Sequence, residues 1–370
     1  MKLFVILPRL AGGGMERMRL HLLPEFQAAG AETFLVVGQL QGELVELVPS
    51  GVPVLEIAPR GPLQFLPGLV RALRKHRPTH ILSAADDVNV MAILANRLGG
   101  TQARVVVSNH NTLSEQITRA TGLQFVKLRG TRTLMRWLYP LADGIVAVSH
   151  GVADDLATQL RLPRNRIRVI YNPVIDREFM ARTMEPCPDF WPKGPEPVIL
   201  FAGRLVPQKR LDVLLEAFAV VLEHQPAHLV IAGKGPRKAW LEAEITRRDW
   251  AHCVTLAGFV PNVLPLVRSS DLLVLSSDHE GLGNVLIEAL AVGTQIVSTD
   301  CPSGPREILE NGKHGQLVPT SDPQTLGRGI LQSLNGTSWF PKDSLIARAQ
   351  DFCATETTRR YLSALCGKQA

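Results

Sequence analysis

Short runs of apolar residues alternate along the chain with longer segments in which apolar residues recur every three or four positions. The short runs are typical of buried strands, and the longer segments are typical of helices that pack on a sheet. The alternation therefore predicts an α/β fold of parallel sheets covered on both faces. The predicted strands lie at residues 3–7, 34–37, 54–57, 81–83, 105–108, 145–148, 198–201, 229–232, 254–257 and 272–275, and the clearest helices at 211–221, 238–247 and 285–291.

The second half repeats the alternation of the first, and 370 residues are too many for one ordinary core. We therefore predict two Rossmann-like, doubly wound domains that face one another across a cleft. The first comprises residues 1–172 and about 350–370, a proline-rich linker spans 173–196, and the second domain spans 197–349. Residues 344–365 are predicted to be helical, and this C-terminal helix is expected to cross back to the first domain. Pro24 is expected to kink its helix or end it early.

The composition is that of a soluble globular protein, with 45% hydrophobic and 20% charged residues and a net charge of +6. The five cysteines are scattered and lack metal-ligand spacing, which favours reduced thiols in the cytoplasm. We expect no signal sequence, because Met1-Lys2 leads directly into the first predicted strand. No apolar run approaches the length of a membrane span.

Two segments, residues 59–80 and 116–142, are basic and apolar and contain no acidic residue. Two interpretations stay open: attachment to an anionic membrane surface at the inner face of the cell membrane, or a solvated helix face over a core stripe. Nucleic acid is not an expected partner, because no recognition motif accompanies the basic residues. In the second segment aromatic side chains, among them Trp137 and Tyr139, accompany the basic residues Arg119, Lys127, Arg129, Arg132 and Arg136.

Glycines and polar side chains follow several predicted strands, at the sheet edge where doubly wound folds bind ligands. Gly12-Gly13-Gly14 follows the first strand, and His110 follows the strand at 105–108. Each has a simpler interpretation, as a tight turn without a ligand and as a structural hydrogen-bonding histidine. Arg204 and Lys209 follow the strand at 198–201, where they suit a diphosphate. Gly233-Lys234-Gly235, a weaker signal, would let a flat base or a ribose approach.

Residues 278–309 carry two glutamates, Glu280 and Glu288, on either side of the turn Gly281-Leu282-Gly283-Asn284. Glycines let the chain come close to a ligand, and the free amides of a helix start bind phosphate or sugar oxygens. Glu288 would share a helix face with the end of that site. The segment predicts a ligand that has both hydroxyls and phosphates.

In combination these motifs resemble those of the retaining glycosyltransferases of family four, which have the GT-B fold. The resemblance covers nearly the whole chain. Residues 301–309, CPSGPREIL, are similar to those of bacterial enzymes that build cell-surface glycans. The motifs that carry the resemblance are Gly12-Gly13-Gly14-Met15-Glu16-Arg17, Asn109-His110-Asn111, Gly203-Arg204-Leu205 with Gln208-Lys209, Gly233-Lys234-Gly235, and the E-x7-E pair Glu280 and Glu288 with its turn.

The resemblance implies a role for each residue. Arg204 and Lys209 would hold the donor diphosphate with Gly13 and Gly14, and Glu288 would hold the ribose beside Gly233, Lys234 and Gly235. Glu280 and His110 would be the catalytic residues that contact the reacting sugar, with sugar and phosphate oxygens held by Gly281, Leu282, Gly283 and Asn284. Retention in this fold is explained by front-face attack, so no residue is assigned as a covalent nucleophile. No metal or other cofactor is expected.

The reaction implied is transfer of a hexose or N-acetylhexosamine, UDP-linked, to a glycan or lipid-linked acceptor in surface polysaccharide or lipopolysaccharide synthesis. Three alternatives remain: a GDP-mannose-dependent mannosyltransferase, a nucleotide-sugar epimerase of the same fold, and a non-catalytic nucleotide-sugar-binding subunit.

Overall fold

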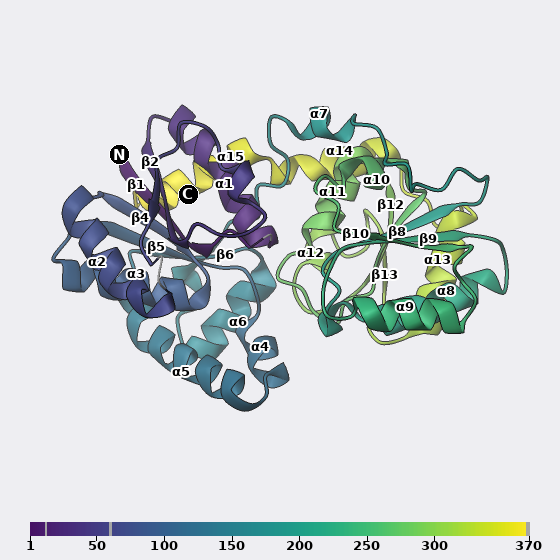
Figure 1. Ribbon diagram of the computed structural model, residues 1–370, viewed down its shortest axis with the longest axis horizontal. Coiled ribbons are helices and arrows are strands. Elements are labelled where there is room, and N and C mark those ends of the chain that lie inside the picture. Colours follow the sequence, from purple (N-terminus) through teal and green to yellow (C-terminus); the bar gives the residue numbers. More distant parts are fainter. Residues whose placement is uncertain (12, 59–60, 368–370) are drawn as a thin grey trace. The chain divides into compact units, whose positions relative to one another are not determined.

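The computed structural model describes residues 1–11, 13–58 and 61–367. It divides into two compact units, residues 1–176 with 352–370 and residues 177–351 (Figure 1). Much of the predicted linker, residues 177–196, falls in the second unit and contains the short helix α7 (Phe179–Thr183).

Seven strands in the described part of the first unit form one parallel sheet, in the order β3-β2-β1-β4-β5-β6-β7. In Figure 1, α1 and α15 lie on one side of this sheet and α2 and α3 on the other. The strands are β1 (Lys2–Arg9), β2 (Glu32–Gln39), β3 (Val54–Glu56), β4 (His80–Ala84), β5 (Arg104–Asn109), β6 (Gly144–Ala147) and β7 (Ile167–Val169). The helices are α1 (Gly14–Ala28), α2 (Phe65–His76), α3 (Asp86–Gly99), α4 (Leu113–Arg119), α5 (Gly122–Leu138), α6 (His150–Leu160) and α15 (Ala354–Leu365).

The second unit, all of whose residues are described, is built around a six-stranded parallel sheet in the order β10-β9-β8-β11-β12-β13. Helices α8, α9 and α13 lie on one side of it and α10 and α11 on the other (Figure 1). The strands are β8 (Val198–Ala202), β9 (His228–Ala232), β10 (Val254–Gly258), β11 (Leu272–Leu275), β12 (Gln295–Thr299) and β13 (Gln316–Val318). The remaining helices are α8 (Leu211–Leu222), α9 (Lys238–Arg247), α10 (Leu264–Ser269), α11 (Asn284–Val292), α12 (Pro305–Ile308), α13 (Pro323–Leu334) and α14 (Lys342–Ala349).

The central strands are buried on both faces, as the continuous apolar runs predict. All five residues of β8 and all four of β11 are buried. The α/β fold with two Rossmann-like sheets is therefore confirmed. In a parallel sheet every strand ends at the same edge, so the loops after β8, β9 and β11 share one edge of the second unit.

The structure corrects two expectations about helices. Pro24 was expected to kink its helix or end it early, and the early end is wrong, since α1 continues to Ala28. Leu22, Leu23 and Phe26 are fully buried around the proline, and their packing outweighs the hydrogen bond that it removes.

Residues 344–365 form two helices, α14 and α15, which the turn Gln350–Phe352 separates. The chain passes from the second unit to the first within this turn. Val174 and Ile175 of the first unit donate backbone hydrogen bonds to the Phe352 carbonyl at 3.1 and 3.3 Å. The C-terminal helix α15 then packs with α1 in the first unit, which confirms that it crosses back.

Candidate functional site

An ion pair that is largely buried lies at the carboxyl edge of the second sheet. Lys209 ends a short turn (Pro207–Lys209) after β8, and Glu280 follows β11, the neighbouring strand. Lys209 Nζ contacts Glu280 Oε1, and only 12% and 8% of the two side chains are exposed. Ser277 Oγ donates to the same carboxylate oxygen at 2.6 Å. The structure thus joins two residues that the sequence predicted as separate members of the site.

Hydrogen bonds hold the two loops of this pair together. Gln208 Nε2 donates to the His279 carbonyl at 2.6 Å, and the Asp278 amide donates to the Gln208 carbonyl at 2.9 Å. Ser276 Oγ donates to the Lys209 carbonyl at 2.7 Å. Lys209 and Glu280 are therefore fixed by backbone contacts on both sides.

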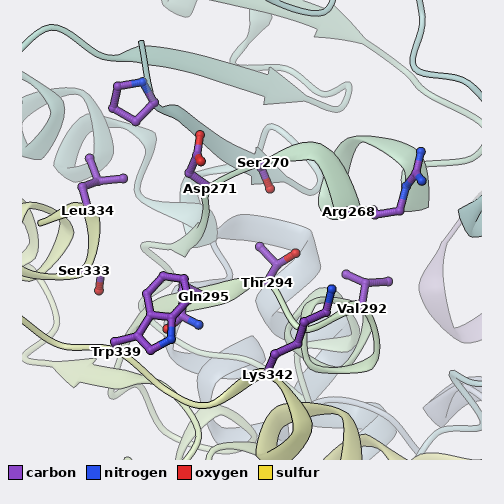
Figure 2. A pocket seen from close by; sticks show the side chains of 12 residues that line it. Arg268, Ser270, Asp271, Val292, Thr294, Gln295, Ser333, Leu334, Trp339 and Lys342 are labelled. Atoms are coloured by element: carbon purple, nitrogen blue, oxygen red, sulfur yellow. The ribbon is translucent and has the colours of Figure 1, made fainter. Parts of the chain in front are cut away.

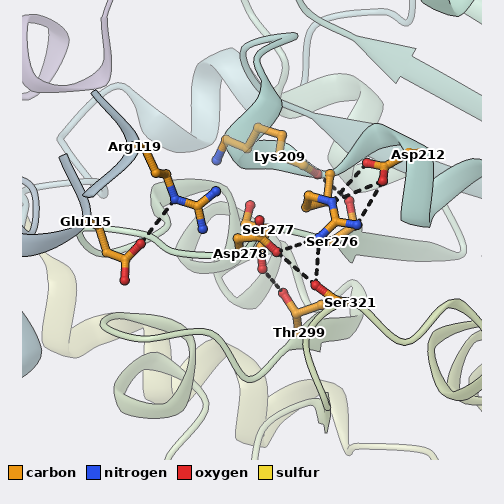
Figure 3. A network of polar contacts seen from close by, with 10 residues as sticks. Glu115, Arg119, Lys209, Asp212, Ser276, Ser277, Asp278, Thr299 and Ser321 are labelled. Carbon is orange, nitrogen blue, oxygen red and sulfur yellow. Dashed lines mark hydrogen bonds and ion pairs between the residues drawn. The ribbon is translucent and has the colours of Figure 1, made fainter. Parts of the chain in front are cut away.

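Arg210 extends the same network, and its partners Asp212, Asp278 and Ser321 are labelled in Figure 3. Its guanidinium donates to Asp278 Oδ1 at 3.1 Å, to Ser321 Oγ at 2.6 Å and to both carboxylate oxygens of Asp212. Because these contacts hold the Arg210 side chain beside Asp212 and Asp278, the arginine has a structural role and connects the segments that carry these residues.

The turn between the two glutamates is shaped by glycine. Gly283 has φ +95°, a left-handed conformation that side chains disfavour, and it places the start of α11 directly after the turn. Gly304 backs the turn, because a Cβ atom there would overlap with the Leu282 carbonyl oxygen. The Glu280 amide donates to the Pro302 carbonyl at 3.3 Å. The CPSGPREIL segment therefore packs against the turn at residues 281–284, the predicted binding turn for sugar and phosphate oxygens.

Glu288 lies on α11, one turn of helix beyond Asn284, and its side chain is half-buried. Arg204 lies in the loop after β8 and is exposed. No side-chain hydrogen bond or ion pair of Arg204 is found among the described residues. Its guanidinium is therefore available to an anion at the same sheet edge.

The glycines after β9 have a packing role that the sequence analysis did not anticipate. A Cβ atom at Gly233 would overlap with the Gly203 carbonyl, and one at Gly235 with the Leu205 carbonyl. On this side the space is taken by the loop that carries Arg204. Gly233 and Gly235 thus allow the loops after β8 and β9 to pack together, with the Leu205 amide donating to the Lys234 carbonyl at 2.8 Å. The approach of a base or ribose to this loop stays a prediction. The Lys234 ammonium lies 4.9 Å from the ring centroid of Phe259.

In the first unit, His110 follows β5 and contacts a buried arginine. Arg19 Nη2 lies 3.2 Å from His110 Nε2, and Ser108 Oγ lies 2.9 Å from the same nitrogen. Burial, and then the positive charge of Arg19, lower the pKa of His110 well below its ordinary value, so the imidazole is neutral at neutral pH. The sequence analysis missed Arg19, although residues 19, 22, 23 and 26 share one helix face and the other three are apolar.

A polar network fixes the strand end that carries His110. Asn109 Nδ2 donates to Asp86 Oδ1 at 2.6 Å, and both Asn109 and Asn89 donate to the Tyr139 hydroxyl, at 3.1 and 3.0 Å. Burial raises the pKa of the Asp86 carboxyl to about 6, an effect that the Asn109 hydrogen bond opposes and the Asp87 carboxylate increases. Asp86 begins α3 directly after β4, a position that the sequence analysis did not single out.

The glycine loop after β1 places Gly13 and Gly14 at the start of α1. Gly12 lies outside the described residues. The Glu16 carboxylate folds back over this helix start, so closely that a Cβ atom at Gly13 would overlap with it. A phosphate at these amides would therefore meet a negative charge, which the sequence analysis did not anticipate.

The basic residues of segment 116–142 lie mainly on α5, where Met135 is the buried residue. Lys127 pairs with Asp87 at 3.6 Å, Arg119 with Glu115 at 3.1 Å, and Arg132 donates to Gln159 at 3.2 Å. The aromatic residue Tyr139 is fully buried. It belongs to the network around Asn109 and therefore does not contribute to an exposed aromatic face.

A cavity of about 250 Å³ lies at the opposite edge of the second sheet (Figure 2). Asp271 and Gln295, at the amino ends of β11 and β12, line it with Trp339 and Lys342. It is separate from the loops that carry Lys209 and Glu280. Among the described residues, no group of three or more His, Cys, Asp or Glu side chains is arranged to hold a metal ion. No helix in the described ranges is long and apolar enough to cross a bilayer.

Two family models match the chain. Residues 12–178 match the model described as Glycosyltransferase Family 4, and residues 196–336 match the one described as Glycosyl transferases group 1. The two matches lie in the two Rossmann-like units, so each unit is similar to a glycosyltransferase domain.

Relatives and solved structures agree with this assignment. The N-acetylgalactosamine-N,N'-diacetylbacillosaminyl-diphospho-undecaprenol 4-alpha-N-acetylgalactosaminyltransferase of Campylobacter jejuni is 26% identical over 375 residues, 99% of this chain and 100% of that protein. An uncharacterized glycosyltransferase of Methanocaldococcus jannaschii is 29% identical over 237 residues; the match covers 60% of each chain, less than two thirds of that relative. Anabaena HepE, crystallised in complex with UDP-glucose, superposes with a TM-score of 0.80 at 18% identity, covering 99% of both chains. This neighbour establishes the GT-B fold.

Proposed function

We propose that this protein is a retaining, metal-independent glycosyltransferase. It moves a hexose or N-acetylhexosamine from a UDP-sugar to a glycan or lipid-linked acceptor in cell-surface polysaccharide synthesis. The observation that carries the proposal is the Lys209–Glu280 pair beside the turn at 281–284, with the exposed Arg204 at the same sheet edge. The name of the Campylobacter jejuni relative supports a lipid-linked acceptor, and the HepE complex supports a UDP-sugar donor.

Arg204 and Lys209 would stabilise the departing nucleotide. Negative charge develops on the diphosphate as the bond to the sugar breaks, and fixed cations offset it without a metal ion. Lys209 has three N–H donors, of which Glu280 takes one. Its ammonium can therefore stay in the ion pair and still donate to a phosphate oxygen.

Glu280 would position the sugar. Its Oε1 atom accepts hydrogen bonds from Lys209 and Ser277, so Oε2 is the atom that would accept from a sugar hydroxyl. A carboxylate held in an ion pair and a hydrogen bond is a weak nucleophile, which agrees with front-face attack and no covalent intermediate. Glu288, on the same helix that the turn begins, would hold the ribose.

The test is turnover by the purified full chain. UDP-glucose, UDP-N-acetylglucosamine, UDP-N-acetylgalactosamine and GDP-mannose are each offered with undecaprenyl-diphosphate-linked saccharides, and released UDP or GDP is measured with and without EDTA. We expect UDP release that EDTA does not reduce and a product whose anomeric configuration matches the donor. Release of GDP from GDP-mannose alone would establish a mannosyltransferase. Binding without release would overturn the enzyme assignment in favour of a non-catalytic subunit.

Arg204→Ala provides the matched variant. Arg204 is exposed, so its loss should leave stability unchanged while removing a charge-assisted contact to the diphosphate. Such a contact is worth about 1.5–3 kcal/mol, or roughly a tenfold to hundredfold loss of kcat/KM. Lys238→Ala, an exposed cation on α9, should leave turnover unchanged. Equal effects of the two substitutions would contradict the role of Arg204.

We also propose that α5 rests on an anionic membrane surface. Leu123, Val126, Leu134 and Trp137 are exposed on α5, at 91%, 66%, 50% and 75%, close to Lys127, Arg129 and Arg136. Exposed apolar side chains among cations suit a bilayer with anionic headgroups. The protein should float with phosphatidylglycerol vesicles. The floating fraction should fall when Lys127, Arg129 and Arg136 are replaced by glutamine. Flotation that these substitutions leave unchanged would remove α5 as the contact surface.

A further inference from the structure

Arg19 is a buried cation without a carboxylate partner among the described residues. Its side chain is 1% exposed, which makes it the largest fully buried side chain of the described structure. The guanidinium donates to the Ser108 hydroxyl and, at 3.0 Å, to the Tyr361 hydroxyl, and its carbon lies 4.7 Å from the Tyr361 ring centroid. A buried charge is costly unless it is well paired, so a folded chain retains one mainly where the charge has a use.

The contacts of His110 indicate what the buried charge of Arg19 does. Arg19 can only donate, because a guanidinium has no acceptor atom. Its Nη2 lies 3.2 Å from His110 Nε2, and the Ser108 hydroxyl, 2.9 Å away, can donate to that same nitrogen. A proton on Nε2 would lie close to the positively charged guanidinium. These contacts favour the lone pair on Nε2 and the single ring proton on Nδ1.

This tautomer leaves a donor unused. His110 Nδ1 is buried and has no hydrogen-bond partner among the described residues. His110 also follows β5 at the carboxyl edge of the sheet, where ligands of doubly wound folds bind. A buried N–H without an acceptor is rare in folded proteins, and a ligand oxygen is the natural partner for one at such an edge.

We propose that Arg19 is a positioning residue, which holds His110 in the neutral Nδ1–H tautomer so that Nδ1–H donates to an oxygen of the bound sugar. The inference rests on the proposed function, because it takes a nucleotide sugar as the ligand. Arg19 itself touches His110, Ser108 and Tyr361, and it acts on the sugar through the histidine.

The first measurement needs no substitution in Arg19. Long-range ¹⁵N–¹H correlation spectra of the ¹⁵N-histidine-labelled full chain distinguish the two neutral tautomers, and His110→Asn identifies the signal. We expect a protonated Nδ1 and an unprotonated Nε2 at neutral pH. A ring protonated on Nε2, or on both nitrogens, would overturn the proposal.

The second measurement compares the affinities of UDP and UDP-glucose. Arg19→Met keeps the volume and removes the donors, and it should mix the tautomers and weaken UDP-glucose about fivefold to tenfold while UDP is unaffected. Arg19→Lys, which can still donate to Nε2, should restore the tautomer and most of the affinity. If Arg19→Met does not fold, Arg19→Lys and Ser108→Ala serve for the comparison.

A cycle with His110 separates positioning from simple structural support. His110→Asn retains an N–H near the Nδ1 position and does not depend on a ring tautomer. Arg19→Met should therefore cost UDP-glucose affinity in the parent chain and nothing further in the His110→Asn background. An equal loss in both backgrounds would show that Arg19 acts only through packing. Failure of the parent chain to bind either UDP or UDP-glucose would contradict the proposed function, whereas the tautomer spectrum reports on Arg19 regardless.

Discussion

Removing Lys209 while keeping Glu280 should destabilise the second unit more than any surface charge does. In Lys209→Met the carboxylate of Glu280, 8% exposed, would keep Ser277 as its donor and lose its counter-charge. Breaking a buried ion pair by removing one partner costs about 3–5 kcal/mol. Because the Lys209 side chain is 12% exposed and water can approach it, we expect the lower end, about 3 kcal/mol.

Substitution of Glu280 as well completes a double-mutant cycle, which gives the sign of the coupling free energy between Lys209 and Glu280. Glu280→Gln keeps an acceptor for Lys209 and Ser277, so it should cost less, about 1–2 kcal/mol. With both substitutions no buried charge is left unpaired, and the double variant should be more stable than Lys209→Met alone. The expected coupling free energy is about 1–3 kcal/mol. Transferase activity should be lost in all three variants.

Urea unfolding followed by tryptophan fluorescence is a suitable assay. Four of the five tryptophans (Trp191, Trp240, Trp250 and Trp339) lie in the second unit, and the fluorescence therefore reports chiefly on that unit. The Lys238–Glu242 pair on α9, with 60% and 53% of its side chains exposed, is the matched control and should contribute less than about 0.5 kcal/mol. If Lys209→Met loses no more stability than Lys238→Met, the assignment of a buried pair is wrong.

Two further predictions concern the loops around the candidate site. The folded pKa of Asp86 is about 6, above its ordinary 3.8, so the stability linked to its neutral form is present below pH 4 and is lost as pH rises through 6. The parent chain should therefore lose about 3 kcal/mol of its free energy of unfolding between pH 4 and pH 8, relative to Asp86→Asn, which has no carboxyl to titrate. Thermal unfolding of both chains across this pH range measures the difference. An identical pH dependence of the two chains would contradict the raised pKa. Gly304→Ala should cost about 3 kcal/mol and weaken UDP-glucose binding, since its φ is +92° and the new Cβ atom would overlap with the Leu282 carbonyl. Gly336→Ala, with φ +70° and no atom within 4 Å, should cost only about 1 kcal/mol in urea unfolding, and equal losses would remove the steric argument.

Most of the sheet architecture could be predicted from the sequence, because fully buried parallel strands leave continuous apolar runs. The predicted runs correspond to β1 to β6 and β8 to β11. The three-residue edge strands β7 and β13 were not predicted: Arg168 interrupts the apolar residues of β7, and Gln316 leaves only two apolar residues in β13. Strand β12, Gln295–Thr299, escaped because three of its five residues are polar, although all five are buried.

The sequence indicated which residues end the strands but not which of them meet. Lys209 and Glu280 are 71 positions apart, and their pairing depends on β8 and β11 being neighbours in the sheet. Arg19 and His110 meet for a similar reason, through the packing of α1 beside the end of β5. The glycines after β9 also have a packing role that the sequence did not reveal, because they allow the loop after β8 to approach.

The return of the C-terminal helix has a consequence for how the protein is made. The Tyr361 hydroxyl that contacts Arg19 lies on α15, and the Leu365 carbonyl accepts from Arg104 at 2.8 Å. The 175 residues from 177 to 351 are synthesised between the two parts of the first unit. At 5–20 residues per second the ribosome needs roughly 10–35 s for them. During that time α15 is absent, so the apolar face of α1 and the Arg19 guanidinium are exposed. We therefore expect the nascent first unit to bind chaperones. The second unit can complete its fold before the first.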